Sequence, residues 1–340
     1  MESDSTVRAR NSTLKRFINL SGLVLLLLSL WLLSKHVISE SSFSTYDLVT
    51  QAHGNFAYAL FFSKYSSVAA GAQDENEDSD FAQIRQLLFQ LLHDPATRTI
   101  GYPVVVCVTE DVSSTQRQRL ASDGATVIVV KAPAASWVHS KTTPAWDCML
   151  AKLNLFNLVQ YDRIAFFASD TVLTRSVDGI FDDPAAQVFA NRGVAKNAPV
   201  AEGVQPAFYV FAANSGAATV DHPYPPPKGK SLVAGCVVFQ PHVELFEYYL
   251  RIANTTDRFP LRNLEQGVWS YAHRRDGNLP WKQLHYDWNV DWASSQDLRH
   301  GIASLKLGTE DTREDLPLRD FVLSIQSKME SFWAAIDGEL

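Results

Sequence analysis

The chain has 340 residues, of which 46% are hydrophobic and 20% are charged. This composition is typical of a globular protein, and the chain is long enough to bury a sizeable core in one catalytic domain. The formal net charge is -7 and the sequence pI is about 5.7, so we expect no polyanion-binding surface and exclude nucleic acid as a partner.

An apolar run near the start of the chain predicts a membrane anchor. Residues 17–33 read FINLSGLVLLLLSLWLL, and at ~1.5 Å per helical residue they would span roughly 25 Å. A cleavable signal peptide is the alternative. Trp31, Lys35 and His36 stand where the small residues of a cleavage site would be, which favours the anchor.

Basic residues before this run indicate which side of the membrane the rest of the chain faces. By the positive-inside rule the short basic tail stays in the cytosol and the remainder enters the lumen. We therefore predict a single-pass type II protein of the Golgi or another secretory-pathway membrane. Its expected parts are a cytosolic tail (1–16), a transmembrane signal anchor (17–37), a stem (38–53) and a catalytic domain (54–335).

The first predicted elements of the domain alternate between strands and helices. Short apolar runs indicate strands, and apolar residues at helical spacing indicate helices. The alternation predicts an α/β fold with a mainly parallel, Rossmann-like sheet and helices on both faces. The expected strands are 55–62, 102–108, 125–130 and 163–167. The expected helices are one ending at Leu92 and capped by Ser79 or Asp80, then 114–122, 146–153, 243–252, 264–273 and 318–332.

Two common site motifs are missing, and a third is only mimicked. The chain has no Gly-x-Gly-x-x-Gly fingerprint of dinucleotide-binding proteins and no Gly-x-Ser-x-Gly elbow of α/β hydrolases. Gly229-Lys230-Ser231 resembles the end of a phosphate-binding loop, but Tyr224 replaces the first glycine in a proline-rich segment. We expect no phosphate loop there.

The three cysteines, Cys107, Cys148 and Cys236, are too few and too far apart for a disulfide framework or a zinc site. We expect all three to be structural. One disulfide with a spare thiol is the open alternative.

The strand at 163–167 leads directly into an acidic turn. Asp170 and Thr171 follow its carboxyl end, where α/β enzymes place their sites. A carboxylate beyond a buried strand is costly unless a cation meets it, so Asp170 is a candidate ligand of a metal or of a donor ribose. The alternative is a cap of the following turn.

This segment and several others resemble glycosyltransferase family 8, the glycogenin-like enzymes. The resemblance extends from about Asn55 to about Trp333 and is greatest to a fungal membrane-anchored N-acetylglucosaminyltransferase-like branch. It is carried by 90–95, Arg119-Leu120, 123–125, Lys152-Leu153, 161–163, Asp170-Thr171, Ala234-Gly235, Glu265-Gln266 and 280–282. The family motif is Asp-x-Asp-Thr, whereas this chain has Ala168-Ser169-Asp170.

The resemblance implies a GT-A fold and a nucleotide-diphosphate sugar donor, UDP-GlcNAc or another UDP-hexose. It also implies transfer with retention to a glycan or glycoprotein acceptor. Such chemistry needs positive charge on the departing diphosphate. In the family, manganese supplies this charge, held by the two motif carboxylates and a histidine near the C-terminus.

The resemblance also implies roles for particular residues. Glu265 and Gln266 match the pair near the reacting sugar, and Asp170 matches a metal ligand. The donor-binding positions are Lys152, Ser169, Asp170, Ala234, Gly235 and Lys306. Alternatives remain for three of these assignments: a solvated helix lysine for Lys152, a polar helix start for Glu265-Gln266, and a buried strand for Ala234-Gly235, where Val233 replaces the usual asparagine.

Lys306 stands where the branch has its metal-binding histidine, so two of three presumed metal ligands are replaced. His300 would substitute only if its loop were reshaped, and a surface histidine is the alternative. This leaves three hypotheses. Asp170 holds manganese with help from the donor, or Lys306 takes the place of the metal, or the chain is a pseudoenzyme that serves as a binding or scaffold protein.

Overall fold

The computed structural model describes residues 54–64, 77–135, 148–193, 203–216, 219–261, 264–307 and 314–338. The chain divides into two units, Met1–Gly54 and Asn55–Leu340. All of the described helices and strands belong to the second unit.

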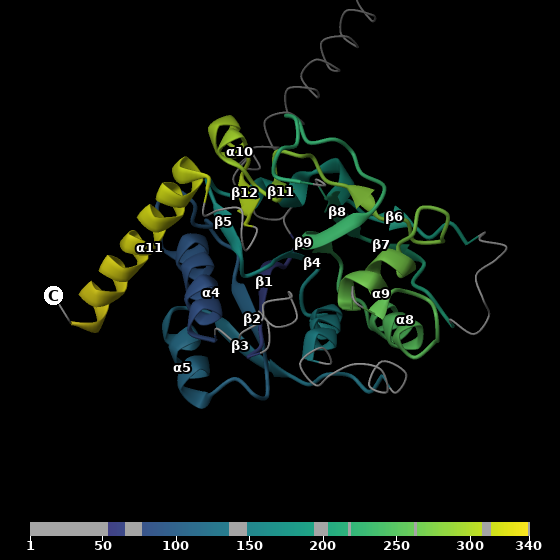
Figure 1. The fold of residues 1–340 in the computed structure, drawn as a ribbon. Helices are drawn as coiled ribbons and strands as arrows, with labels where there is room; N and C mark the ends of the chain where they lie inside the picture. Colours follow the sequence, from purple (N-terminus) through teal and green to yellow (C-terminus); the bar gives the residue numbers. More distant parts are fainter. Residues whose placement is uncertain are drawn as a thin grey trace, which may run out of the picture. The chain divides into compact units, whose positions relative to one another are not determined.

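A seven-stranded sheet forms the centre of this unit, in the order β10-β8-β9-β4-β1-β2-β3 (Figure 1). Its strands are β1 (Phe56–Phe62), β2 (Val104–Thr109), β3 (Thr126–Val130), β4 (Arg163–Phe167), β8 (Phe211–Ser215), β9 (Leu232–Phe239) and β10 (Lys282–Gln283). Within this sheet only β9 runs antiparallel to its neighbours, β4 and β8. The prediction of a mainly parallel sheet is therefore confirmed.

Helices cover both faces of the sheet, as the alternating pattern predicted. On one face lie α4 (Glu77–Leu92) and α5 (Ser114–Ser122), and on the other η1 (Leu150–Asn157), α8 (Val243–Ala253) and α9 (Leu264–Ala272). Successive side chains of β1 point to opposite faces of the sheet. Because helices cover both faces, every residue of β1 is buried. Tyr58 and Leu60 pack on the α4 side, whereas Ala59 and Phe61 pack on the η1 side.

Three helices differ from their predicted bounds by more than one residue. α4 begins at Glu77, before the expected cap at Ser79 or Asp80. The helix expected over 146–153 begins outside the described residues, and from Leu150 it is the 3-10 helix η1, whose nearly continuous run of buried residues leaves no amphipathic period to mark its end. The last helix, α11 (Leu316–Asp337), is longer than expected. The Asp315 carboxylate caps its start, and Gly338 ends it with a φ of 77°.

A second sheet of three very short strands was not predicted. Its strands are β5 (Thr171–Leu173), β11 (Asn289–Asp291) and β12 (Ser304–Lys306), in the order β11-β12-β5. β12 runs parallel to β11 and antiparallel to β5. The remaining elements are η2 (Asp178–Asp182), η3 (Pro184–Ala186), β6 (Phe189–Ala190), β7 (Phe208–Tyr209) and α10 (Ser295–His300).

The expected fold needs one correction, which concerns its transmembrane helix. The anchor predicted at 17–37 lies outside the described residues, as do the tail and the stem. Among the residues that the structure does describe, no helix is both long enough and apolar enough to cross a membrane. The described fold is the α/β unit alone, and its apolar strands and helices are buried in the hydrophobic clusters on the two faces of the large sheet.

No disulfide joins Cys107, Cys148 or Cys236, so the disulfide alternative is not realised. Cys107 on β2 and Cys236 on β9 are fully buried. Burial raises the pKa of the Cys107 thiol to about 12 and raises that of Cys236 as well, so both stay protonated and act as small apolar side chains.

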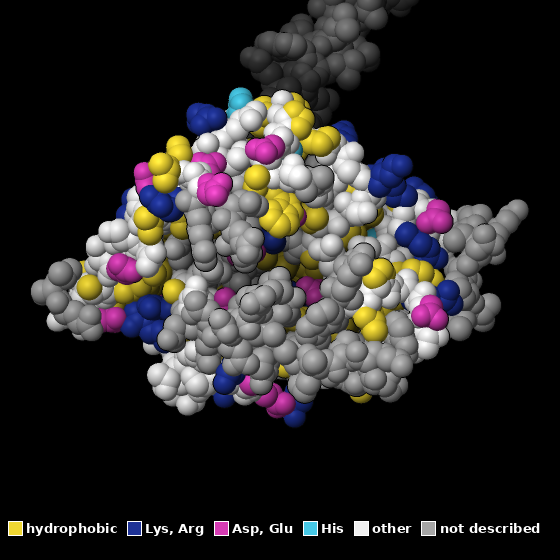
Figure 2. Space-filling model, viewed as in Figure 1, with side chains coloured by type: hydrophobic (Ala, Val, Ile, Leu, Met, Phe, Trp, Pro, Cys, Tyr) yellow, Lys and Arg dark blue, Asp and Glu magenta, His cyan; other side chains and the backbone are white. Residues whose placement is uncertain are grey.

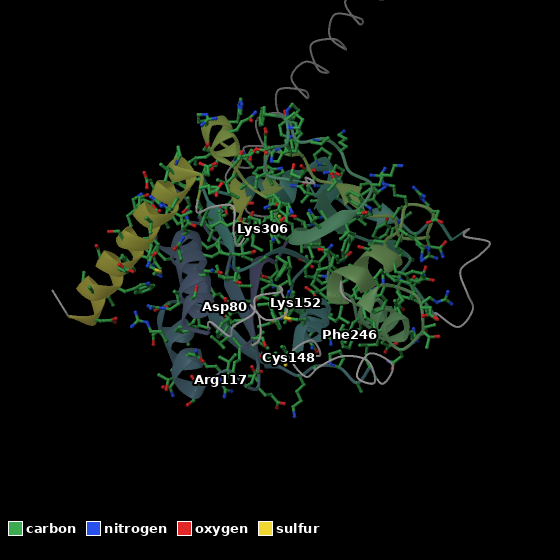
Figure 3. All side chains as sticks on the ribbon, in the orientation of Figure 1. Asp80, Arg117, Cys148, Lys152, Phe246 and Lys306 are labelled. Atoms are coloured by element: carbon green, nitrogen blue, oxygen red, sulfur yellow. The ribbon has the colours of Figure 1, made fainter. Side chains whose placement is uncertain are left out.

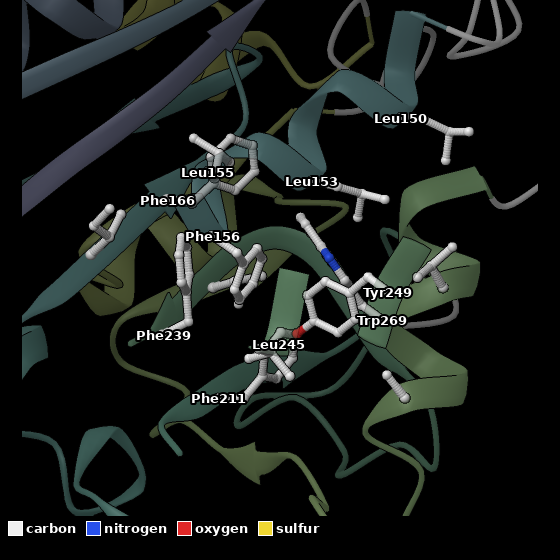
Figure 4. Close-up of a cluster of buried hydrophobic side chains, with 14 of the residues drawn as sticks. Leu150, Leu153, Leu155, Phe156, Phe166, Phe211, Phe239, Leu245, Tyr249 and Trp269 are labelled. Atoms are coloured by element: carbon white, nitrogen blue, oxygen red, sulfur yellow. The ribbon is translucent and has the colours of Figure 1, made fainter. Parts of the chain in front are cut away.

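Aromatic residues fill the core on the η1 side (Figure 4). Trp269 of α9 is fully buried, and its ring lies 5.9 Å from that of Phe156 and 6.2 Å from that of Phe211. This core fixes α9 against the sheet. The helix in turn holds Glu265 and Gln266 in place.

His273 is buried in the same region and should make the stability of the protein depend on pH. Its Nδ1 lies 2.7 Å from the Leu279 carbonyl oxygen and its Nε2 lies 2.5 Å from the Tyr249 hydroxyl, an arrangement that suits a neutral ring. Burial lowers the pKa of His273 to about 3, although the bond to Leu279 opposes the shift.

In the unfolded chain His273 takes up a proton near pH 6.5, whereas in the folded protein its ring stays neutral down to about pH 3. The contribution of the neutral ring to the free energy of unfolding should therefore be complete above pH ~6.5 and lost as the pH falls toward the folded-state pKa. The free energy of unfolding should fall by about 1.4 kcal/mol per pH unit below ~6.5 on account of this group. Urea titrations of the wild type and of His273→Gln between pH 4 and 8 measure the slope. Equal slopes in the two proteins would show that His273 is not responsible.

Candidate functional site

Asp170 lies just beyond the carboxyl end of β4, where the sequence placed it. β9 runs antiparallel to β4, with Cys236 opposite Phe167, so the first half of β9 continues past the end of β4. The Ala168 N–H donates a hydrogen bond of 2.9 Å to the Gly235 carbonyl. Ala234 and Gly235 therefore border the turn that carries Ser169 and Asp170.

The small sheet brings Lys306 to the same turn. Lys306 pairs with Thr171 across β12 and β5, and the Leu307 N–H donates to the Asp170 carbonyl at 3.0 Å. The Lys306 Nζ lies 3.3 Å from Asp170 Oδ2 and 3.1 Å from Asp291 Oδ1. One ammonium thus lies between two carboxylates, Asp170 from the turn before β5 and Asp291 from β11.

The surroundings of Lys306 keep its side chain charged. Burial alone would lower the pKa of Lys306, but the negative charges and hydrogen bonds of Asp170 and Asp291 outweigh it, and the pKa is raised. The side chains are 28%, 33% and 10% exposed for Lys306, Asp170 and Asp291, so Asp291 depends most on the lysine for compensation of its charge.

Gly235 makes room for the stem of Lys306. A Cβ built on Gly235 would lie 2.5 Å from the Lys306 Cδ, closer than real contacts allow. The neighbouring Ala234 N–H donates to Gln266 Oε1 at 3.1 Å. Gln266 is thereby tied to the strand beside Lys306.

Lys152 and Glu265 form a second, largely buried ion pair. Lys152 Nζ lies 2.6 Å from Glu265 Oε1, and the two side chains are 14% and 11% exposed. The Lys152 ammonium also lies 5.5 Å from the centre of the Phe61 ring of β1. The interpretation of Lys152 as a solvated helix lysine is therefore wrong.

The predicted residues are joined by one continuous chain of contacts. Lys152 contacts Glu265, Gln266 contacts Ala234, and Gly235 contacts both the stem of Lys306 and the turn before Asp170. We call Lys152, Asp170, Glu265, Asp291 and Lys306 the charged cluster. Figure 3 labels Lys152 on η1 and Lys306 on β12. Figure 2, drawn from the same side, shows hydrophobic side chains near the middle of the visible face.

Manganese does not fit this arrangement of side chains. The position expected for the first motif carboxylate is Ala168, and the carboxylate of Asp170 already faces the ammonium of Lys306. A divalent ion beside that ammonium would meet a like charge. Within the described ranges, no group of three or more His, Cys, Asp or Glu side chains is placed to hold a metal. His300 is exposed at the end of α10, where its ring stacks on Tyr224 at 3.6 Å, as a surface histidine would.

Sequence reasoning missed two residues of this region. Asp291 supplies the second carboxylate, but β11 is too short to show a strand pattern. Trp292, which follows it, is exposed and has a φ of 59°, a strained value for a bulky residue. Lys306 contacts the residues on both sides of Trp292. Its ammonium pairs with Asp291, and its carbonyl accepts a hydrogen bond of 3.2 Å from the Ala293 N–H. The predicted phosphate-loop mimic, Gly229-Lys230-Ser231, leads into β9 and not into a helix.

No protein-family model matches the chain. Among proteins of Schizosaccharomyces pombe, two uncharacterised proteins are similar to it. One is 25% identical over 256 residues, which are 65% of this chain and 65% of that protein. The other is 26% identical over 272 residues, which are 71% of this chain and 70% of that protein. The match to the first thus spans less than two thirds of its length.

Several solved structures are similar to the chain. They include the glycosyltransferase GlyE of Streptococcus pneumoniae (14% identity, TM-score 0.46, 83% of this chain and 64% of GlyE). An active-site mutant of LgtC is also similar (8% identity, TM-score 0.41, 74% of this chain and 86% of LgtC). So is mouse xyloside xylosyltransferase 1 (12% identity, TM-score 0.42, 76% of this chain and 98% of that protein). Since these TM-scores are below 0.5, the basis for a function is the geometry of the charged cluster.

Proposed function

We propose that the protein transfers a sugar from a nucleotide-diphosphate donor, UDP-GlcNAc or another UDP-hexose, to a hydroxyl of a glycan or glycoprotein. The observation that carries this proposal is a chain of contacts beyond the carboxyl end of β4: the ion pairs Lys306–Asp170 and Lys152–Glu265 are joined through Gly235, Ala234 and Gln266, positions far apart in the sequence. This edge is where open α/β sheets bind their ligands. A GT-A fold and retention of anomeric configuration are part of the proposal.

The transfer breaks the bond between the anomeric carbon and the diphosphate oxygen, and the electron pair leaves with the nucleotide. The acceptor oxygen forms the new bond to that carbon and passes its proton to the departing diphosphate oxygen. Lys306 would stabilise the charge on the departing diphosphate. Lys152 would be held toward the donor by Glu265, and Gln266 and Gly235 would border the sugar.

A binding protein of the same fold is the second candidate. It is favoured by the replacement of the first motif carboxylate by Ala168 and by the pairing of both lysines with internal carboxylates. Such a protein would bind the donor without transferring it. Action in the Golgi or another secretory compartment, expected from the sequence, stays a prediction.

The first test is whether the full chain binds and cleaves a UDP-sugar. Calorimetry should detect binding of UDP and of UDP-GlcNAc, and release of free UDP should show slow hydrolysis of the donor without an acceptor. Failure to bind UDP, UDP-GlcNAc and UDP-glucose would overturn the proposal. Binding without transfer to any of a panel of glycan acceptors would favour the binding protein.

Gly235→Ala and Gly101→Ala form a matched pair that ties binding to this site. The new methyl group at position 235 would displace the stem of Lys306, and we expect at least a tenfold loss of UDP affinity, the cost of one charged hydrogen bond. Gly101 is the open counterpart: among the described residues, its chain neighbours aside, no heavy atom lies within 4 Å of an added Cβ. Gly101→Ala should therefore bind as the wild type does.

A further inference from the structure

The ammonium of Lys306 has the surroundings that proteins usually give to a bound cation. It lies between Asp170 Oδ2 at 3.3 Å and Asp291 Oδ1 at 3.1 Å, and these carboxylates come from two segments on opposite sides of β12 in the small sheet. Asp291 is largely buried, so its charge needs a fixed partner. The stem of Lys306 packs across Gly235, which holds the ammonium in place.

We propose that Lys306 is the resident cation of this site, in place of a divalent metal, and that its removal leaves a two-carboxylate cradle able to take up Mn²⁺. The part that concerns donor binding rests on the proposed function, whereas the part that concerns the cradle does not.

The number of hydrogen-bond donors on the ammonium supports a direct role toward a diphosphate. A lysine ammonium carries three N–H donors, and two carboxylates, those of Asp170 and Asp291, lie within ion-pair distance of it at 3.3 Å and 3.1 Å. Two facing carboxylates leave a donor for an oxygen of the ligand. Because the Lys306 side chain is 28% exposed, a ligand can reach it without unfolding the small sheet.

A lysine differs from a bound metal ion because a chelator cannot remove it. The wild-type protein should therefore bind UDP equally well in EDTA and in Mn²⁺. Oxygen ligands suit Mn²⁺, and two carboxylates with bound water make a weak site once the competing ammonium is gone. Manganese affinity should then appear only in variants at position 306.

The experiment uses the full chain as wild type, Lys306→Ala and Lys306→Met, with Lys131→Ala as control. Lys306→Met keeps the stem over Gly235 and removes only the charge, which guards against loss of folding. Lys131 pairs with Glu110 at the surface, with side chains 77% and 58% exposed, away from any assigned role. Mn²⁺ binding without nucleotide is measured by electron paramagnetic resonance, and UDP binding by calorimetry in EDTA and in Mn²⁺.

We expect Lys306→Ala to bind Mn²⁺ at least tenfold more tightly than the wild type and Lys131→Ala do. In EDTA, both variants at position 306 should bind UDP about 10–100-fold more weakly than the wild type, the cost of one charged hydrogen bond. Mn²⁺ should restore UDP binding to Lys306→Ala only.

The possible failures can be told apart. A wild type that binds UDP only with Mn²⁺ would overturn this inference and leave the proposed function standing. A Lys306→Ala protein that folds but gains no Mn²⁺ affinity would also overturn it. If the wild type binds no UDP in either condition, the proposed function fails, and a gain of Mn²⁺ by Lys306→Ala still supports Lys306 as the resident cation.

Discussion

Lys152→Met is expected to reduce sugar transfer by about 10²–10³-fold, the usual cost of losing one electrostatic stabiliser at a reacting centre. It should also lower the free energy of unfolding by about 2–4 kcal/mol, because it leaves the carboxylate of Glu265 largely buried without its counter-charge. Transfer is measured as UDP release in the presence of acceptor, and stability by urea titration.

The double variant Lys152→Met with Glu265→Met separates the two effects. Replacing both partners of a buried pair by apolar side chains is often neutral, so stability should return to within about 1 kcal/mol of the wild type. Transfer should not return. If transfer recovers together with stability, the pair is structural only and Lys152 does not act on the donor.

The surface pair Lys131–Glu110 is the matched control for stability. Its Nζ–Oε1 distance of 3.0 Å is similar to that of the buried pair, but its side chains are 77% and 58% exposed. Because solvent screens an exposed pair, Lys131→Met should lower the free energy of unfolding by less than about 1 kcal/mol. A loss as large as that of Lys152→Met would contradict the role given to burial.

Trp269→Ala is expected to cost about 3–5 kcal/mol of the free energy of unfolding. The indole is fully buried and contacts Phe156, Phe166 and Phe211 from three different elements, so its removal leaves a cavity that few neighbours can fill (Figure 4). Since α9 carries Glu265, binding of UDP should weaken as well. Urea titration and calorimetry measure the two effects.

Ile100→Ala is the control for loss of apolar volume. Ile100 is exposed, and its truncation should change stability by no more than about 0.5 kcal/mol. A Trp269→Ala protein as stable as Ile100→Ala would mean that the core on the η1 side is not packed as described.

The sequence alone determined the α/β class and the main elements of the fold. β1 and residues 164–167 of β4 are apolar runs that are buried throughout, because helices cover both faces of the sheet at its central strands. The position of Asp170 just beyond β4 follows from the same run. These features depend on neighbours in the chain, so local patterns were enough to find them.

Only the tertiary structure decided the composition of the charged cluster. The strands of the small sheet have three residues each, too few to show a period, and their pairing depends on segments far apart in the chain. The sequence pointed to Lys306 by its place in a resemblance, but it could not reveal that Asp291 shares its ammonium.

The same limit applied to Lys152. Its place before β4 was compatible with a solvated helix lysine, and only the folded chain brings Glu265 of α9 to within 2.6 Å of it. The contribution of a charged residue to stability and to ligand binding depends on its burial and on its partner. Both are set by contacts between distant segments, which the order of residues along one segment does not encode.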